Sequence, residues 1–356
     1  MQDLVGFARQ KVAPRADELI RSTEFPADLW AEMGSNGWLG FAMGTYGGID
    51  ASPLELFDTA AAFAEAAEVV GFCTPWMTHH MVATRIVGQH ADAEQAARWM
   101  GRFARGDSSA CIAISEPGAG AHPKRLTTRA EKTATGWRLN GEKAWLTNGP
   151  LADVFVVVAI TDVVDGRKTF GAFLVPEDAP GLSRTEGIAI DYVRPAGHCG
   201  LKLENVDLAD DAYLAGAGDA VETVLKRFRR VEDTIGLAVK AGIARVQLRR
   251  LGALLSSEQA GELGALAADR DLYHAAARQL MDDSGGDPVS TEHEGRLLAL
   301  RSLGRRFQDR VMALLEPVNG RDPFLDLLCR DMSKLGGVAA GVDQAKHVKR
   351  GAGLIG

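Results

Sequence analysis

Two short segments in the middle of the chain carry residue types that could bind a ligand. The first is Ser115-Glu116-Pro117-Gly118-Ala119-Gly120. Because glycine accepts positive φ angles, its two glycines let backbone amides approach a bound group closely and point at a phosphate or at the edge of a ring. Ser115 adds a hydroxyl to the same turn. A glycine-rich turn also occurs without any ligand, so this segment alone leaves both interpretations open.

The second segment, Gly141 to Gly149, has the sequence GEKAWLTNG. Trp145 and Thr147 occupy alternate positions of a predicted strand, so their side chains share one face. An indole can stack on a planar heterocycle, and a hydroxyl can bond one of its ring nitrogens. The alternative is that Trp145 is a core residue at the end of the strand.

Helix signals dominate the first hundred residues. Ser52-Pro53-Leu54-Glu55 combines an N-cap serine, a proline at the first helical position and a capping-box glutamate. Asp92 and Gln95 repeat the capping pattern, and Gly106 ends the helix that follows. We therefore predict an N-terminal α-helical domain over residues 1–108.

The pattern then changes to short β-rich runs, at 111–114, 137–139, 154–160 and 170–175. Turn residues such as Pro180-Gly181 separate or follow these runs. Several strands without long helices between them indicate an antiparallel sheet or barrel. We assign this central β domain to residues 109–218.

Helical signals return from about Ala220, and we assign residues 219–356 to a C-terminal helical bundle. Breaks are expected at 284–288 and at 317–320, and Asp322 followed by Pro323 restarts a helix. The last six residues match Gly-x-Gly-x-x-Gly, but they follow no predicted strand. We expect a glycine turn or a free tail there. The predicted fold class is α+β multidomain.

The composition excludes several classes of protein. The formal net charge of −7 gives no electrostatic reason to expect nucleic acid as a partner. No apolar run is long enough for a membrane span, and the N-terminus lacks a leader pattern. The four cysteines are scattered and the adjacent His79 and His80 cannot converge on one ion, so we expect no metal. Reduced thiols favour a cytoplasmic location.

Together, in this order and between two helical domains, the two segments resemble the acyl-CoA dehydrogenase family. There they read Thr-Glu-Pro-x-Ala-Gly-Ser-Asp and Gly-x-Lys-x-Trp-Ile-Thr-Asn-Gly. The resemblance continues in Tyr46-Gly47-Gly48 and in Phe173-Leu174-Val175-Pro176, and it extends to about Ala244. It implies an N-terminal helical domain, a central antiparallel β-barrel and a C-terminal four-helix bundle. It also implies FAD, held between the β domain of one subunit and the bundle of another.

Carried over residue by residue, the resemblance implies that Trp145 packs on the flavin and that Thr147 lies at its N5 side. The cofactor-binding residues that it implies are Ile114, Ser115, Gly120, Ala121, Trp145 and Thr147. The implied reaction is the FAD-dependent α,β-dehydrogenation of an acyl thioester, expected to be acyl-CoA, to the trans-2-enoyl thioester. A glutamate removes the α proton, the β hydrogen leaves as hydride, and electrons pass to an electron-transfer flavoprotein.

The resemblance also implies which glutamate is the base. Many members carry it near the C-terminus beyond a glycine turn, but no glutamate follows Glu316 here. Other members carry it on the first long bundle helix, before a stretch that Val239 to Ala244 matches, and Glu232 falls at that position. Glu232 is therefore the catalytic candidate. The alternative is a solvated helix glutamate, since charged helix residues are ordinarily exposed.

Two departures from the family pattern concern contacts to the cofactor or substrate. Ala121-His122 replaces the usual Ser-Asp, and the stretch Ser256 to Gly261 lacks an arginine that reaches the FAD pyrophosphate of a neighbouring subunit. We therefore expect a related, non-identical subunit in a heterotetramer, with a homo-oligomer as the rival. Two further functions stay open: a non-catalytic partner subunit of a related dehydrogenase, and a flavin-dependent monooxygenase of the same fold.

Overall fold

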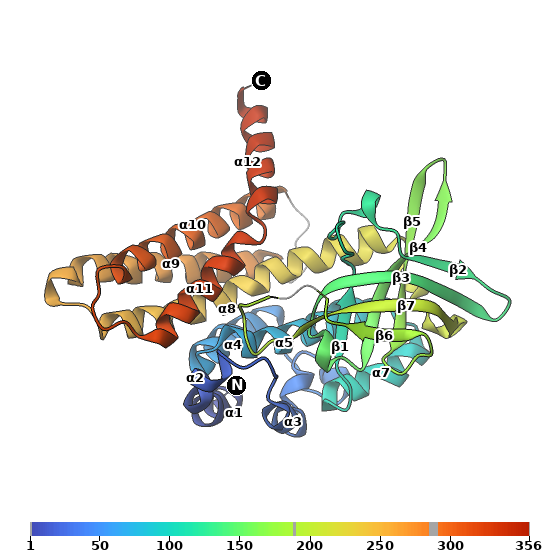
Figure 1. Cartoon of the computed structure of the whole chain (residues 1–356), viewed down its shortest axis with the longest axis horizontal. Coiled ribbons are helices and arrows are strands. Elements are labelled where there is room, and N and C mark those ends of the chain that lie inside the picture. The colour runs from blue at the N-terminus through green and yellow to red at the C-terminus, as the bar shows by residue number, and fades with distance from the viewer. Residues whose placement is uncertain (1, 188–189, 285–290, 356) are drawn as a thin grey trace. The chain divides into compact units, whose positions relative to one another are not determined.

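The computed structural model describes residues 2–187, 190–284 and 291–355 (Figure 1). The chain divides into two compact units. The first contains residues up to 21, residues 53–73 and residues from 233 onward, and the second contains residues 22–52 and 74–232. These units follow packing, whereas the predicted domains follow the change from helices to strands. The boundaries at 108 and 218 therefore stay predictions.

The first unit is helical. Helix α8 (Lys226–Gly252) lies mostly in this unit, and α5 (Val70–Met81) begins in it. Its other helices are α1 (Gln2–Phe7), α2 (Ala16–Leu19), α4 (Pro53–Ala67), α9 (Ala260–Ser284), α10 (Thr291–Leu315), α11 (Pro323–Gly337) and α12 (Ala340–Ile355).

Four of these helices share one apolar core. Buried side chains from α8, α9, α10 and α11 form a single cluster that includes Leu251, Leu266, Val311 and Leu325. As predicted, Asp322 caps α11, because its carboxylate accepts a hydrogen bond from the backbone of Phe324 at 2.9 Å. The predicted C-terminal bundle is confirmed.

Helix α12 corrects the expectation for the end of the chain. Gly351 and Gly353 lie inside α12, so the prediction of a turn or free tail was wrong for them, and Gly356 lies outside the described residues. The helix is fixed by Asp343, which is fully buried and accepts hydrogen bonds from Arg301 at 2.8 Å and from Arg305 at 2.7 Å. Of the break predicted at 284–288, only Ser284 is described, as the last residue of α9.

The second unit combines helices with the sheet. Its helices are α3 (Ala27–Ser35), α6 (Gly88–His90) and α7 (Ala93–Arg105), together with the end of α5 and the start of α8. The predicted capping box of α7 is present: Asp92 accepts from the Gln95 backbone at 2.8 Å, and the Gln95 side chain accepts from the Asp92 backbone at 3.0 Å. Gly106 ends α7 in the left-handed conformation.

In the described part of the chain, seven strands form one curled sheet, drawn from green to yellow in Figure 1. The path is β1-β4-β2-β3-β7-β6, and β5 pairs with β4. The strands are β1 (Ala110–Ala113), β2 (Arg129–Lys132), β3 (Gly136–Thr147), β4 (Val154–Val164), β5 (Arg167–Pro176), β6 (Leu182–Thr185) and β7 (His198–Ala209).

The fold class predicted from the sequence is confirmed, with one refinement of the sheet. Most pairings are antiparallel, but β1 and β2 both run parallel to β4, because the β2–β3 hairpin is inserted in the chain between β1 and β4. The sheet core includes Phe155, Phe173 and Leu201, all fully buried. Among the described residues, no helix is both long and apolar enough to cross a bilayer.

Candidate functional site

Trp145 lies in an irregular part of β3. Lys143 pairs with Leu201 and Leu146 with Cys199, so β3 advances three residues where β7 advances two. This arrangement is a β-bulge with one extra residue. Trp145 has a φ of 62°, in the left-handed region, and 43% of its surface is exposed. The bulge therefore presents a large aromatic ring to solvent from within a well-paired sheet.

Thr147 is held at the end of the same strand. It pairs directly with His198, the first residue of β7, and Thr147 Oγ1 lies 2.9 Å from His198 Nε2. The backbone carbonyl of Thr147 accepts from the Cys111 thiol at 3.1 Å. Burial lowers the pKa of His198 to about 4, against an opposing effect of the Ala196 carbonyl. His198 is therefore neutral at physiological pH.

The turn after β1 runs beside the bulge. The carbonyl of Ser115 accepts a hydrogen bond from the backbone of Ala144 at 2.8 Å, and the amide of Glu116 donates to Gly120 at 3.0 Å. Gly118 and Gly120 have φ angles of 67° and 58°, and a Cβ on either would meet nothing within 4 Å. The turn therefore depends on glycine for its backbone and leaves open space beside it.

A buried ion pair joins this turn to β3. Lys143 Nζ donates to Glu116 Oε1 at 3.0 Å and to the Ile114 carbonyl at 3.1 Å. The Glu116 carboxylate also accepts from the backbones of Thr127 and Thr128 at 2.6 Å and 2.9 Å. Burial acts to raise the pKa of Glu116, but the charge of Lys143 and these hydrogen bonds outweigh it and lower the pKa to about 2.

The structure brings four of the predicted cofactor-binding residues together. Ile114 and Ser115 directly follow β1, and the contacts of Lys143 and Ala144 join them to the strand that carries Trp145 and Thr147. Gly120 closes the adjoining turn, and Ala121 follows it, partly exposed. Glu232 lies half-buried on α8, and its place near the other residues stays a prediction.

Neither His198 nor the pairing of Glu116 with Lys143 was predicted from the sequence. The strand β7 that carries His198 was not predicted, although Leu201 and Leu203 alternate with polar residues along it. Glu116 and Lys143 both stood in the quoted motifs, but they are far apart in sequence and no local pattern pairs them. The contact of His198 with Thr147 and the contact of Glu116 with Lys143 both depend on how neighbouring strands pair, which a local sequence pattern does not show.

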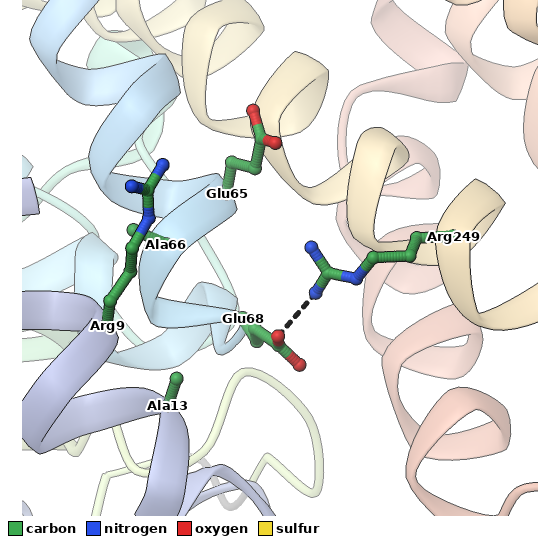
Figure 2. Close-up of a pocket in the computed structure, with 6 residues that line it drawn as sticks. All are labelled: Arg9, Ala13, Glu65, Ala66, Glu68 and Arg249. Atoms are coloured by element: carbon green, nitrogen blue, oxygen red, sulfur yellow. Dashed lines mark hydrogen bonds and ion pairs between the residues drawn. The ribbon is translucent and has the colours of Figure 1, made fainter.

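A small open pocket of about 250 Å³ lies in the first unit and contains none of these residues (Figure 2). It is lined by Arg9, Ala13, Glu65, Ala66, Glu68 and Arg249. Figure 2 shows Arg249 reaching toward Glu68, and Arg250 donates to the same carboxylate at 2.8 Å. The charges on its walls are thus of both signs.

The adjacent histidines of α5 serve packing. Both rings are fully buried, and burial lowers the pKa of His79 to about 4 and that of His80 to about 3. His79 accepts from the backbone of Ala110 at 3.2 Å. The described residues contain no cluster of side chains that could hold a metal ion, and all four cysteines are buried as free thiols.

Comparison with protein families gives two adjacent matches. Residues 2–107 match the acyl-CoA dehydrogenase N-terminal domain, and residues 111–206 match the acyl-CoA dehydrogenase middle domain. The second match includes both motif segments and His198.

Individual relatives agree with these matches. The chain is 28% identical over 227 residues to a mitochondrial isovaleryl-CoA dehydrogenase of Solanum tuberosum, which covers 63% of this chain and 55% of the relative. The match thus spans about half of the relative's length. Among solved structures, butyryl-CoA dehydrogenase from Megasphaera elsdenii aligns with a TM-score of 0.85 at 19% identity, over 100% of this chain and 98% of the other. Glutaryl-CoA dehydrogenase from Mycobacterium smegmatis in complex with FADH2 aligns with a TM-score of 0.78 at 22% identity, over 96% and 93%.

Proposed function

This chain belongs to the acyl-CoA dehydrogenase family, and we propose that it is a FAD-dependent subunit that oxidises an acyl thioester. The substrate would be an acyl-CoA and the product its trans-2-enoyl thioester. The exposed ring of Trp145 is the observation that carries this proposal. A non-glycine residue in the left-handed region costs about 1–2 kcal/mol, and an indole that is 43% exposed gains less from burial than a core indole does. A planar ligand that stacks on the ring would account for both.

The residues around Trp145 fit a flavin. Thr147 and Ser115 supply hydroxyl groups on the two segments that flank the ring, and the turn at Gly118 and Gly120 is open where side chains would otherwise stand. Trp145 would pack on the isoalloxazine, with Thr147 and Ser115 as its hydrogen-bonding partners. Bound FAD would supply the hydride acceptor. The chain's own contribution is to bind and orient the ring and to keep water from it.

Glu232 is the proposed base for the α proton. Glu232 is half-buried on α8, at the position that the family resemblance assigns to the base. The carboxylate would hold the abstracted proton while the thioester carbonyl is stabilised by hydrogen bonds.

We also propose a related, non-identical subunit as the partner. The stretch from Ser256 to Gly261 begins α9 with a capping box between Ser256 and Gln259, and it offers no arginine for a neighbouring cofactor. Ala121 likewise replaces a hydroxyl. A second chain that retains these groups would complete the site, and an electron-transfer flavoprotein would then accept the electrons.

The test is a comparison of Glu232→Gln with a matched control on the same helical segment. Glu222 is exposed and pairs with Lys226 at 2.5 Å, so Glu222→Gln should leave turnover unchanged. With a panel of acyl-CoA thioesters and an artificial electron acceptor, Glu232→Gln should lower kcat by about 10²–10⁴-fold. If the reconstituted complex loses nothing, this chain does not supply the base.

That outcome would favour the non-catalytic partner subunit, to which the missing arginine also points. Turnover that consumes oxygen and needs no acyl-CoA would instead identify the flavin monooxygenase.

A further inference from the structure

A cluster of charged side chains in the first unit has no part in the proposed reaction. It joins α8, α10 and α12. Arg301 donates to Asp343 at 2.8 Å and also contacts Asp233, and Arg305 donates to Asp343 at 2.7 Å. Asp343 is fully buried, so its charge depends on the two arginines. Two positive and two negative side chains therefore compensate one another in this cluster.

Lys240 adds a positive charge that the cluster does not compensate. It is half-buried on α8, seven residues after Asp233, and it forms no hydrogen bond or ion pair with any described residue. Burial and the two arginines lower the pKa of Lys240, against the opposing effect of the two carboxylates. Lysine is almost never buried unless it is paired. Its ammonium therefore needs a counter-ion that the described residues do not supply.

The face of α8 that carries Lys240 leaves room for such an ion. Residues three and four positions apart lie on one face of a helix, and Gly236 stands between Asp233 and Lys240 at this spacing. A Cβ on Gly236 would meet nothing within 4 Å. The space that a side chain would fill there is open, and it lies on the same face as the uncompensated ammonium.

We propose that Lys240 forms an anion-binding site beside Gly236, and that its ligand is a small oxyanion, either a carboxylate or a phosphate. The lysine ammonium has three N–H donors, and none of them is used by a described residue. Hydrogen bonds from an ammonium to an oxyanion are charge-assisted and therefore strong. The bound oxyanion offsets the repulsion between Lys240 and the two arginines that hold Asp343, so it also stabilises the attachment of α12.

The lysine resonances of the full chain test the site directly. In protein labelled with ¹³C-lysine, the signal of Lys240 is the one that is lost in Lys240→Arg. The pKa of Lys240 should rise when acetate or inorganic phosphate replaces chloride at constant ionic strength, whereas that of the exposed Lys349 should not. The anion with the larger effect shows whether the ligand is a carboxylate or a phosphate. A pKa that neither anion raises, or an equal rise at Lys349, would overturn the proposal.

Thermal unfolding is the second measurement. Phosphate stabilises many proteins without binding to a site, so wild-type protein is compared with Lys240→Met in the same buffers. At about five times the dissociation constant of the anion, Tm should rise by about 2 °C more in wild-type protein than in Lys240→Met. Lys349→Met, at an exposed position of α12, is the matched control and should respond like wild-type protein. Equal responses in wild-type protein and Lys240→Met would contradict the site. Neither measurement involves flavin, so both outcomes are independent of the proposed function.

Discussion

At the scale of single residues, the site depends on side chains placed by backbone features that are costly by themselves. Trp145 is held in the left-handed region by a bulge, and the neighbouring Asn148 has a φ of 68°. Strain of this kind persists only where the surrounding structure enforces it, and it concentrates at functional sites. Here β1 and β7 supply the enforcing contacts through Cys111, Asn148 and His198.

Trp145→Gly should separate stability from flavin binding. Glycine accepts a φ of 62° without penalty, and this gain offsets the loss of the buried part of the indole, so the free energy of unfolding should change by less than about 1 kcal/mol. The stacking surface is lost, so flavin content should fall. Thermal unfolding and visible absorption measure the two effects, and Trp145→Phe, which keeps a ring, is the control. A variant with full flavin content would show that the ring is dispensable.

The resemblance carried by the two motifs was sufficient to predict that Trp145, Thr147 and Ser115 belong to one site, and the structure brings their segments together. Their contacts to a flavin stay a prediction. His198 could not be predicted in the same way. Its role depends on the register between β3 and β7, and a one-residue slip would move it to the other face.

At the scale of elements, the Glu116–Lys143 ion pair fixes the Ser115 turn against β3. Both residues are almost fully buried, at 3% and 2% exposure, and the carboxylate is further satisfied by the backbones of Thr127 and Thr128. A buried pair of this kind contributes mainly by geometry, since the cost of desolvation offsets much of its attraction. It keeps the ligand-facing turn in register with the bulge.

Breaking this pair should be strongly destabilising. Glu116→Gln leaves the Lys143 ammonium buried without its partner, which costs about 3–5 kcal/mol. Denaturant unfolding measures this loss, and the double variant Glu116→Gln/Lys143→Met should recover part of it. The exposed pair of Arg138 and Asp207, at 2.7 Å on the same sheet, is the control, and Arg138→Ala should change little. Equal effects at both pairs would contradict a structural role for burial.

The same carboxylate predicts an acid-sensitive contribution to stability. Because the folded state holds the pKa of Glu116 at about 2, below its ordinary value of 4.5, its contribution is complete above the ordinary value. It is lost as the pH falls from about 4.5 through 2. The free energy of unfolding of wild-type protein should thus decline more steeply in that window than that of Glu116→Gln. Parallel pH profiles would show that Glu116 is not held ionised.

The elements themselves were predictable where local chemistry defines them. The capping box at Asp92, the glycine that ends α7 and the Asp322 cap are local signals, and all three act as predicted. Strands β2, β6 and β7 were missed, because β2 and β6 are short and largely exposed and the bulge interrupts the pairing of β7. The helical end of the chain was missed because Asp343 stabilises α12 through arginines that are distant in sequence.

At the scale of the whole molecule, the proposal is a shared enzyme. This chain retains the residues that would face a flavin ring, and the stretch from Ser256 to Gly261 lacks the arginine expected to serve a neighbour's cofactor. A heteromer would need only one functional copy of each half of the site. The expected partner is therefore a related chain that carries the missing contacts.

The most direct test is the flavin content of this chain, from its visible absorption spectrum, when it is purified alone and when it is copurified with a candidate related subunit. We predict little flavin in the lone chain, bound flavin in the complex, and loss of that flavin when this chain carries Trp145→Ala. A complex that contains no flavin, or that keeps all of it with Trp145→Ala, would contradict a flavin site built on Trp145.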